Sequence, residues 1–261
     1  MKNALDLFRL EGKVAVVTGG AGAIGSAIVK ALAEAGATVV AASRDVERCQ
    51  TFAHEMSQGG LRVEGARCDL ASEQEIRDLR DDVIRRHGAV DILFNNSVAR
   101  HGGDLRHTRG ADLDASLQVN GTGLMLACQI FSETMQERRS GSIVNIGSIY
   151  GMVSPDFPLY EGMKMGNRID YAFVKGGMLN LTRYLACYLA PFGVRVNCLS
   201  PGAVQTSNLP ESFVSGFAQR VPLGRLAQAW EMHGAALFLA SDASTYVTGQ
   251  NIVVDGGWTA V

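Results

Sequence analysis

Short runs of apolar, largely β-branched residues alternate along this chain with longer segments in which apolar positions recur at helical spacing. The short runs predict strands over 14–18, 38–42, 62–68, 91–95, 142–146, 194–199 and 251–254. The longer segments predict helices over 25–35, from 47 onward, over 72–86, around 113–136, over 171–190 and after 229. Within the strands the apolar positions are continuous rather than alternating, which is typical of a parallel sheet covered by helices on both faces.

The strand–helix alternation predicts an α/β fold, a doubly wound parallel sheet of Rossmann type in three α/β/α layers. No linker rich in proline and serine, no charge block and no internal repeat divides the 261 residues, so we expect a single domain over 1–261. Gly36 is expected to end the first helix in the left-handed conformation. Ser72 is expected to cap a later helix, with Glu75 reaching back to complete a capping box.

Composition and charge exclude several classes of protein. Hydrophobic residues make up 47% of the chain and charged residues 19%, so it can bury a large core and disorder is excluded. The formal net charge of −2 offers no basic field for nucleic acid. The five scattered cysteines contain no C-x-x-C and are typical of reduced thiols in a cytoplasmic protein. The apolar stretch over 14–17 is too short for a signal sequence or a membrane span, and the histidines lack metal-ligand spacing, so we expect neither a membrane nor a metal as a partner.

A glycine-rich turn follows the first predicted strand. Gly20, Gly22 and Gly25 form the pattern G-x-G-x-x-G, and the apolar positions of a helix begin at Ile24. Amides at a helix N-terminus bind phosphate, and glycines let the ligand approach the backbone closely. We therefore expect the turn to hold the pyrophosphate of a dinucleotide. The alternative, an ordinary glycine-rich connection, is disfavoured by the position between a strand and a helix.

A second group of residues has the chemistry of proton transfer. Tyr171 and Lys175 stand four residues apart on a predicted helix, which places them on one face. A free phenol has a pKa of about 10, and a neighbouring ammonium favours its ionised form. Ser148, just after the strand over 142–146, is placed to hydrogen-bond a substrate oxygen and orient it.

Tyr160 and Lys164 form a competing pair with the same spacing, closer to the serine in sequence. The downstream pattern decides between the two pairs. From Tyr171 an uninterrupted helical pattern leads to the strand over 194–199, whereas Tyr160 is followed by glycines that disfavour a helix. We therefore assign the proton-transfer pair to Tyr171 and Lys175.

Together these motifs resemble the short-chain dehydrogenase/reductase family, in its single-domain branch of this length, from about residue 12 to residue 257. The family's turn reads T-G-x-x-x-G-x-G; Thr18, Gly19 and Gly25 match it, while Ala23 replaces the middle glycine, at a cost if that position needs a positive φ. The family's N-N-A-G motif is also altered, because Val98 replaces its glycine and a β-branched residue tolerates positive φ poorly.

The resemblance implies roles for individual residues. The tyrosine exchanges a proton with the substrate, the serine orients the substrate oxygen, the lysine also holds the nicotinamide ribose, and an asparagine holds a water that links the lysine to solvent. The implied catalytic residues are Ser148, Tyr171, Lys175 and Asn120. The implied cofactor-binding residues are Gly19, Gly22, Ala23, Ile24, Gly25, Ser43, Arg44, Asp69, Leu70, Asn95, Ser97, Tyr171, Lys175, Pro201, Gly202, Val204 and Thr206.

The end of the second predicted strand bears on the choice of cofactor. NAD enzymes of this fold carry an acidic residue there to grip the adenosine ribose, but the strand over 38–42 ends in Ser43 and Arg44. Asp45 comes later and is expected to start the next helix. Because a guanidinium binds phosphate in a bidentate fork, NADP(H) is favoured. The alternative, in which Arg44 stacks on the adenine, accepts NAD(H) as well.

The resemblance implies an NAD(P)-dependent oxidoreductase that interconverts a secondary alcohol and a ketone of a small-molecule substrate. A loop is inserted near 151–168. If it lines the pocket, its polar residues favour a sugar, sugar acid or polyol-like substrate; the alternative is a surface loop or a subunit contact. A substrate lid is expected near 207–226, where Phe213 and Phe217 are either lid face or core. The alternatives are a reductase of 3-oxoacyl thioesters on acyl carrier protein and a sensor that binds dinucleotide without turnover. The resemblance also implies a homotetramer or homodimer built on the helices at 113–136 and 171–190.

Overall fold

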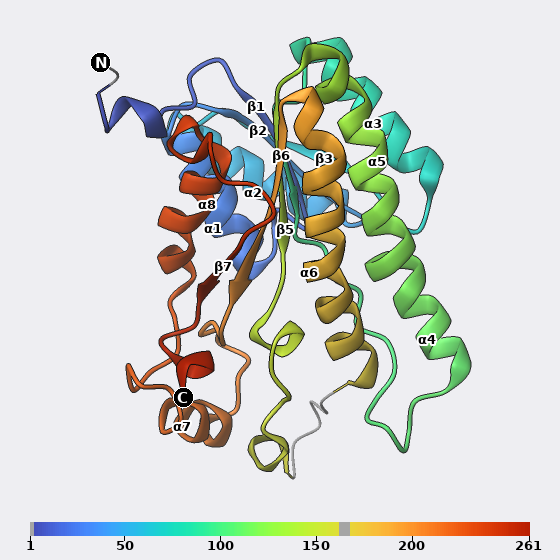
Figure 1. Ribbon diagram of the computed structural model, residues 1–261, viewed down its shortest axis with the longest axis vertical. Coiled ribbons are helices and arrows are strands. Elements are labelled where there is room, and N and C mark those ends of the chain that lie inside the picture. Colours follow the sequence, from blue (N-terminus) through green and yellow to red (C-terminus); the bar gives the residue numbers. More distant parts are fainter. Residues whose placement is uncertain (1–2, 162–167) are drawn as a thin grey trace.

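The computed structural model describes residues 3–161 and 168–261, and within them seven parallel strands form one sheet (Figure 1). The strand order is β3-β2-β1-β4-β5-β6-β7. The strands are β1 (Val14–Thr18), β2 (Thr38–Ser43), β3 (Val63–Arg67), β4 (Ile92–Asn95), β5 (Gly141–Ile146), β6 (Val194–Pro201) and β7 (Asn251–Val254). The order reverses between β1 and β4, and in such sheets ligands bind in the crevice at the carboxyl ends of the strands at this point. The predicted doubly wound sheet is confirmed.

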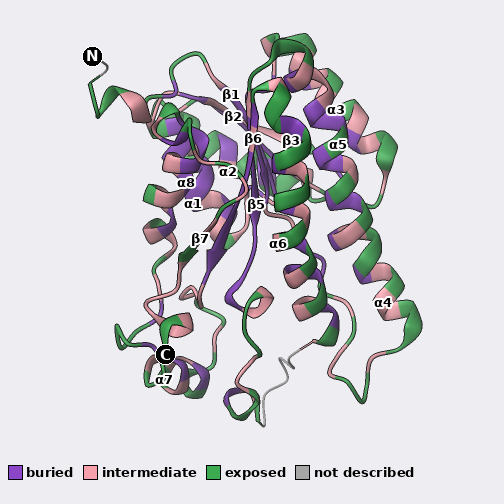
Figure 2. Ribbon diagram, in the orientation of Figure 1, coloured by how far each residue is buried: buried purple, intermediate pink, exposed green. Residues whose placement is uncertain are grey.

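Helices cover both faces of the sheet, as the continuous apolar strands require. On one face lie α1 (Ala23–Glu34), α2 (Val46–Gln58) and α8 (His233–Ala240), and on the other α3 (Glu73–His87), α5 (Leu124–Arg138) and α6 (Ile169–Leu189) (Figure 1). Every residue of β1 and β4 is buried between these layers, which Figure 2 shows as a purple centre with green outer helix surfaces. Among the described helices, none is both long and apolar enough to cross a membrane.

The prediction of one continuous helix around 113–136 is wrong. It is divided into α4 (Gly110–Leu117) and α5 by a π-helical segment over Gln118–Gly123. The cause lies at Asn120, whose side chain binds the backbone of Ala99 instead of facing solvent. At Gly123 a Cβ would collide with the carbonyl oxygen of Leu70, so the widened turn also lets the helix approach this loop closely. Single π turns within helices occur frequently at functional sites.

Two predicted helix boundaries can be compared with the structure. Gly36 has a φ of +101°, as predicted for the residue that ends α1. Ser72 caps α3 by accepting a hydrogen bond from the amide of Glu75 (3.3 Å). The second half of the predicted capping box is wrong, because the Glu75 carboxylate accepts from the amide of Asp69 (2.8 Å) and the Ser72 amide donates to the Asp69 carbonyl.

A third apolar cluster lies beyond the carboxyl ends of the strands, where the short helix α7 (Glu211–Ala218) packs against the segment after β5. Phe213 and Phe217 of α7 are both buried, and Phe217 stacks on Trp258 with ring centroids 4.2 Å apart. The cluster also contains Ile149 and Leu159. Phe213 and Phe217 therefore belong both to a small core and to the wall of the cavity described next.

Candidate active site

Three cavities meet at the carboxyl ends of the strands. The glycine-turn crevice, of about 720 Å³, is bordered by the turn after β1 and by the ends of β2, β3 and β4. The Ser148 cavity, of about 560 Å³, lies between the segments after β4, β5 and β6 and the helix α7. A much smaller cavity lies beside α6 and is bordered by Asn120, Tyr171 and Lys175. Arg100 borders both large cavities, so a ligand extending from one to the other would pass this residue.

The predicted site residues are distributed over these cavities. The glycine-turn crevice is lined by Gly19, Gly22, Ala23, Ile24, Ser43, Arg44, Asp69, Leu70 and Ser97. The Ser148 cavity is lined by Ser148, Tyr171, Gly202 and Val204. Asn95, Asn120, Tyr171 and Lys175 border the small cavity. Gly25, Pro201 and Thr206 line none of the three.

The glycine turn has the close packing that a pyrophosphate cradle needs. Gly19 has a φ of +64°, and a Cβ on Gly25 would collide with the Gly19 carbonyl oxygen. Ala23 has no positive φ, so the cost considered for this replacement does not arise. The turn is clamped to the loop after β4, since the Thr18 hydroxyl accepts from the amides of Asn96 (3.0 Å) and Ser97 (3.1 Å). Ala23 and Ile24, at the start of α1, line this crevice, and the first amides of a helix have no acceptor within it.

The polar residues that follow β2 have different roles. Asp45 caps α2 by accepting from the amide of Arg48 (3.0 Å), as expected for the residue that starts the next helix. Its carboxylate is thereby engaged, while Arg44 lines the crevice. Arg48 lines it as well, which sequence reasoning missed. Its only signal was a second basic residue within the first turn of the helix after the strand.

Asn95 and Asn96, the first residues of the segment Asn95–Val98, form hydrogen bonds to neighbouring strands and to the glycine turn. The Asn95 amide group donates to Asn145 Oδ1 (2.9 Å) on β5, and its Oδ1 is a buried oxygen without a hydrogen-bond partner in the described part of the chain. Asn96, which was not predicted as a site residue, donates from Nδ2 to the carbonyls of Thr18 and Gly19. Val98 has no positive φ, so this loop avoids the strain considered for it.

Ser148 and Tyr171 border one cavity, and Lys175 lies behind the tyrosine. The Lys175 ammonium is 5.7 Å from the centre of the Tyr171 ring and donates to the Ile146 carbonyl (2.5 Å). Only 5% of Lys175 is exposed. A buried ammonium favours a negative charge nearby, and the phenolate of Tyr171 would supply one. The Ser148 hydroxyl accepts from the amide of Tyr150 (3.2 Å), which leaves its proton available for another acceptor.

Asn120 links the segment after β4 to the start of α6. Its Oδ1 accepts from the amide of Ala99 (2.8 Å), and its Nδ2 donates to the Ala99 carbonyl (2.9 Å) and to the Ser116 hydroxyl (3.0 Å). Ser116 in turn donates to Asp170 Oδ2 (2.5 Å). Asp170 precedes Tyr171 directly, so this buried chain of hydrogen bonds ties the tyrosine's helix to the loop that carries Arg100.

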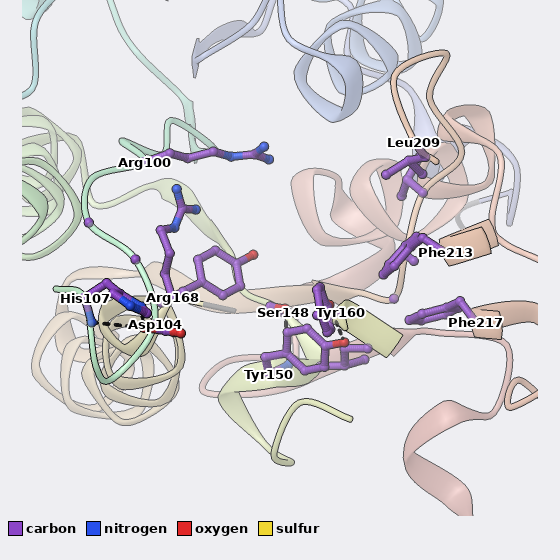
Figure 3. A pocket seen from close by; sticks show the side chains of 17 residues that line it. Arg100, Asp104, His107, Ser148, Tyr150, Tyr160, Arg168, Leu209, Phe213 and Phe217 are labelled. Atoms are coloured by element: carbon purple, nitrogen blue, oxygen red, sulfur yellow. Dashed lines mark hydrogen bonds and ion pairs between the residues drawn. The ribbon is translucent and has the colours of Figure 1, made fainter. Parts of the chain in front are cut away.

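Tyr160, the competing tyrosine, is held by partners other than a lysine. Its hydroxyl lies 2.7 Å from that of Tyr150, and its ring packs against Phe213 at 5.4 Å between centroids (Figure 3). Burial raises the pKa of both phenols. Both therefore remain neutral hydrogen-bonding groups. Lys164, the other half of the competing pair, lies outside the described residues.

Only some residues of the inserted loop line the Ser148 cavity. Tyr160 and Arg168 line it, whereas Phe157 and Glu161 are exposed and Asp156 forms an ion pair with Arg220. Arg168, Arg100, Asp104 and His107 are cavity residues that sequence reasoning missed. For Arg100, Asp104 and His107 the only signal was a cluster of charge near 100–109, and for Arg168 it was its place at the end of the inserted loop.

Comparisons with known proteins agree with this fold. Residues 19–259 match the family model described as Enoyl-(Acyl carrier protein) reductase. The chain is 34% identical over 254 residues to a 3-oxoacyl-[acyl-carrier-protein] reductase from Thermotoga maritima, covering 95% of this chain and 98% of that one. It is 32% identical over 256 residues to a D-threitol dehydrogenase from Mycolicibacterium smegmatis, covering 97% and 95%.

Among solved structures, a gluconate 5-dehydrogenase from Burkholderia cenocepacia, in complex with NADP and tartrate, matches with a TM-score of 0.90. It is 33% identical, and the match covers 99% of this chain and all of that one. The chain thus belongs to the short-chain dehydrogenase/reductase family, as its motifs predicted, and is an oxidoreductase of this family.

Proposed function

We propose that this enzyme interconverts a secondary alcohol and a ketone with NADP(H), using Tyr171, Ser148, Lys175 and Asn120. The observation that carries the proposal is that Ser148 and Tyr171 border one cavity beside the glycine-turn crevice, with a buried lysine behind the phenol. A dinucleotide held by the residues of that crevice would supply or accept the hydride at its nicotinamide. The residues of the chain hold the substrate and move the proton.

Each catalytic side chain has a separate task in this proposal. Ser148 donates a hydrogen bond to the substrate oxygen and orients it. Tyr171 gives its proton to that oxygen during reduction and takes it back during oxidation. Lys175 stabilises the phenolate between these events. Asn120 holds the loop at Ala99 against α4 and so keeps the wall of the small cavity beside Lys175 in place.

The preference for NADP(H) is supported by the end of β2. Arg44 and Arg48 both line the crevice, and the carboxylate that follows β2 directly, that of Asp45, is engaged as a helix cap. A 2′-phosphate would find two guanidinium groups here, whereas β2 itself ends in Ser43 and Arg44 and offers a ribose hydroxyl no carboxylate. The gluconate 5-dehydrogenase with the matching structure was solved with NADP.

For the substrate, we propose a sugar, sugar acid or polyol-like compound. The polar side of the Ser148 cavity supports this, since Tyr150, Tyr160, Arg100 and Arg168 offer hydrogen bonds to hydroxyl and acid groups. Relatives act on D-threitol and gluconate. The alternative, a 3-oxoacyl thioester, is favoured by the apolar side of the same cavity at Leu209, Phe213 and Phe217, and by the relative from Thermotoga maritima.

A panel of substrates tests these proposals. The change in absorbance of NADPH or NADP⁺ would be followed with polyols, aldonates and their ketones, and with acetoacetyl thioesters, and repeated with NADH or NAD⁺. Turnover confined to the thioesters would replace the proposed substrate by the alternative. Tight dinucleotide binding with no turnover of any compound would favour a sensor.

We further propose a cytoplasmic homotetramer or homodimer. The described part of the chain contains all five cysteines, and none is in a disulfide. The outer face of α6 exposes Phe173 (72% exposed) and the stacked pair Tyr184 and Tyr188, an apolar face that a second copy would cover. Sedimentation equilibrium would show a dimer or tetramer, and a monomer at every concentration would overturn this proposal.

A further inference from the structure

Two arginines lie together on one wall of the Ser148 cavity. Arg100 extends from the loop after β4, and Arg168 from the residue before α6 (Figure 3). They are close enough to repel one another electrostatically, and Arg168 also interacts with Tyr171. Two guanidinium groups are thus held beside the phenol proposed to exchange the proton.

The charge of these two groups is incompletely balanced. Neither Arg100 nor Arg168 forms an ion pair within the described chain, and residues 162–167 contain no aspartate or glutamate. Outside the cavity, by contrast, Arg220 is paired with Asp156, and Arg225 with Glu231. Arg100 and Arg168 are therefore two charged groups of the cavity wall that no ion pair within the described residues neutralises.

Two acidic groups lie near the pair, and one oxygen of each is held by other partners. Asp104, on the same wall, accepts from His107 Nδ1 (2.6 Å) and from the amides of Arg106 and His107 (3.0 Å each). Asp170 attracts Arg168 but is buried, and its Oδ2 accepts from Ser116. Burial lowers the pKa of Arg168, the repulsion by Arg100 lowers it further, and Asp170 offsets these effects only in part. An anion between the two guanidinium groups would relieve this arrangement.

We propose that Arg168 and Arg100 bind the anionic group of a small hydroxy acid or oxo acid and so place its reacting carbon beside Tyr171. Guanidinium groups bind carboxylate and phosphate groups in a bidentate manner, so the chemistry recognised is an oxyanion. Because Arg168 lies close to Tyr171, the anion must lie near the reacting carbon. This inference rests on the proposed oxidoreductase function and selects the acid among the substrates proposed.

The apolar wall opposite the arginines would orient such a substrate. Leu209, Phe213 and Phe217 lie across the cavity from the arginines, with Ser148 and the Tyr150–Tyr160 pair between them (Figure 3). The acid group would bind at the charged wall and the remaining carbon chain at the apolar wall. The carbon that exchanges hydride then lies between them, next to Ser148.

The test compares matched substrates in matched variants. A hydroxy acid that the enzyme oxidises would be compared with its amide, and a phosphate monoester of the same carbon chain would distinguish carboxylate from phosphate. We expect Arg168→Gln and Arg100→Gln to lower kcat/KM for the acid about 10- to 100-fold, mainly through KM, and to change the value for the amide little. Arg106→Gln, which removes an exposed arginine of the same loop outside the cavity, should leave both values unchanged.

Equal losses for acid and amide in the arginine variants, or no preference of the wild-type enzyme for the acid, would overturn the inference while leaving the oxidoreductase function intact. Calorimetry keeps the inference testable if no substrate is turned over. Binding of a short hydroxy acid to the wild-type protein with NADP⁺ present, weakened about 10-fold or more in Arg168→Gln, would support it. Unaltered binding, or none to the wild-type protein, would overturn it. Circular dichroism of each variant would confirm that it folds.

Discussion

The hydroxyl groups of Tyr150 and Tyr160 lie 2.7 Å apart, so Tyr160, the tyrosine of the competing pair, is hydrogen-bonded to another phenol. The tyrosine farther along the chain, Tyr171, has the buried ammonium of Lys175 5.7 Å from its ring centre. Two tyrosines with the same sequence spacing to a lysine thus have different surroundings. One is suited to shape the cavity, and the other to exchange a proton.

This difference predicts opposite results for two matched substitutions. Tyr171→Phe should lower kcat about 100- to 10,000-fold, because a positioned proton donor contributes rate of that order. Tyr160→Phe should change kcat less than about 10-fold, since it removes one hydrogen bond between neutral phenols. Steady-state kinetics with saturating NADP(H) would measure both. If Tyr160→Phe abolished turnover and Tyr171→Phe left it unchanged, the assignment of the catalytic tyrosine would be wrong.

Arg44 should determine the preference between the two dinucleotides. Arg44→Gln is expected to lower the ratio of kcat/KM for NADPH to that for NADH about 10- to 100-fold, because a charge-assisted bond to the 2′-phosphate is lost. The value for NADH should change little. Arg85→Gln, on the exposed side of α3, serves as the control. A wild-type preference for NADH would contradict this prediction at the outset.

Ser116 should contribute to stability through its two buried hydrogen bonds. Ser116→Ala removes the acceptor of Asn120 and the donor to Asp170, whose Oδ1 already has no partner among the described residues. Leaving buried polar groups unpaired costs about 1–3 kcal/mol each, so we expect the free energy of unfolding to fall by at least this amount. Urea denaturation would measure the change.

The matched control is Ser132→Ala, another buried serine, whose hydroxyl donates to a carbonyl of its own helix. Its cost should stay below about 1 kcal/mol. Equal costs for the two serines would show that the hydrogen-bond chain from Asn120 to Asp170 adds nothing to stability.

Glu231 should make stability depend on pH in the acid range. A bidentate bond from Arg225, with N–O distances of 2.7 and 2.8 Å, lowers the pKa of Glu231 from 4.5 to about 2. The stability from a carboxylate with a lowered pKa is present above its unfolded value and is lost as pH falls toward its folded value. The melting temperature of Glu231→Gln should therefore lie below that of the wild-type protein at pH 5–7, and the gap should close between about pH 4.5 and pH 2. A gap that stayed constant down to pH 2 would contradict the prediction, and Glu55→Gln, an exposed glutamate, is the control.

Much of the fold followed from local patterns along the chain. The strand predicted over 14–18 coincides with β1, because its continuous apolar residues are all buried between the helix layers of a parallel sheet. The strand predicted over 251–254 coincides with β7, an edge strand that is only partly buried. The end of α1 at Gly36 followed for the same kind of local reason. The predicted bond from the Ser72 amide to Glu75 does not form, because in the turn before α3 this amide donates to the Asp69 carbonyl and Glu75 accepts from the Asp69 amide instead.

The amino-acid sequence by itself determined the sheet, its helices, the glycine turn and the spacing of Tyr171 and Lys175, because these depend on residues close to one another along the chain. Only the tertiary structure decided that α4 and α5 are separated at Asn120, that Tyr160 turns toward Tyr150, and that Arg100 and Arg168 share a wall. These relations join loops that follow different strands. No periodic pattern records them, because the loops meet only where the parallel strands end at a common edge of the sheet.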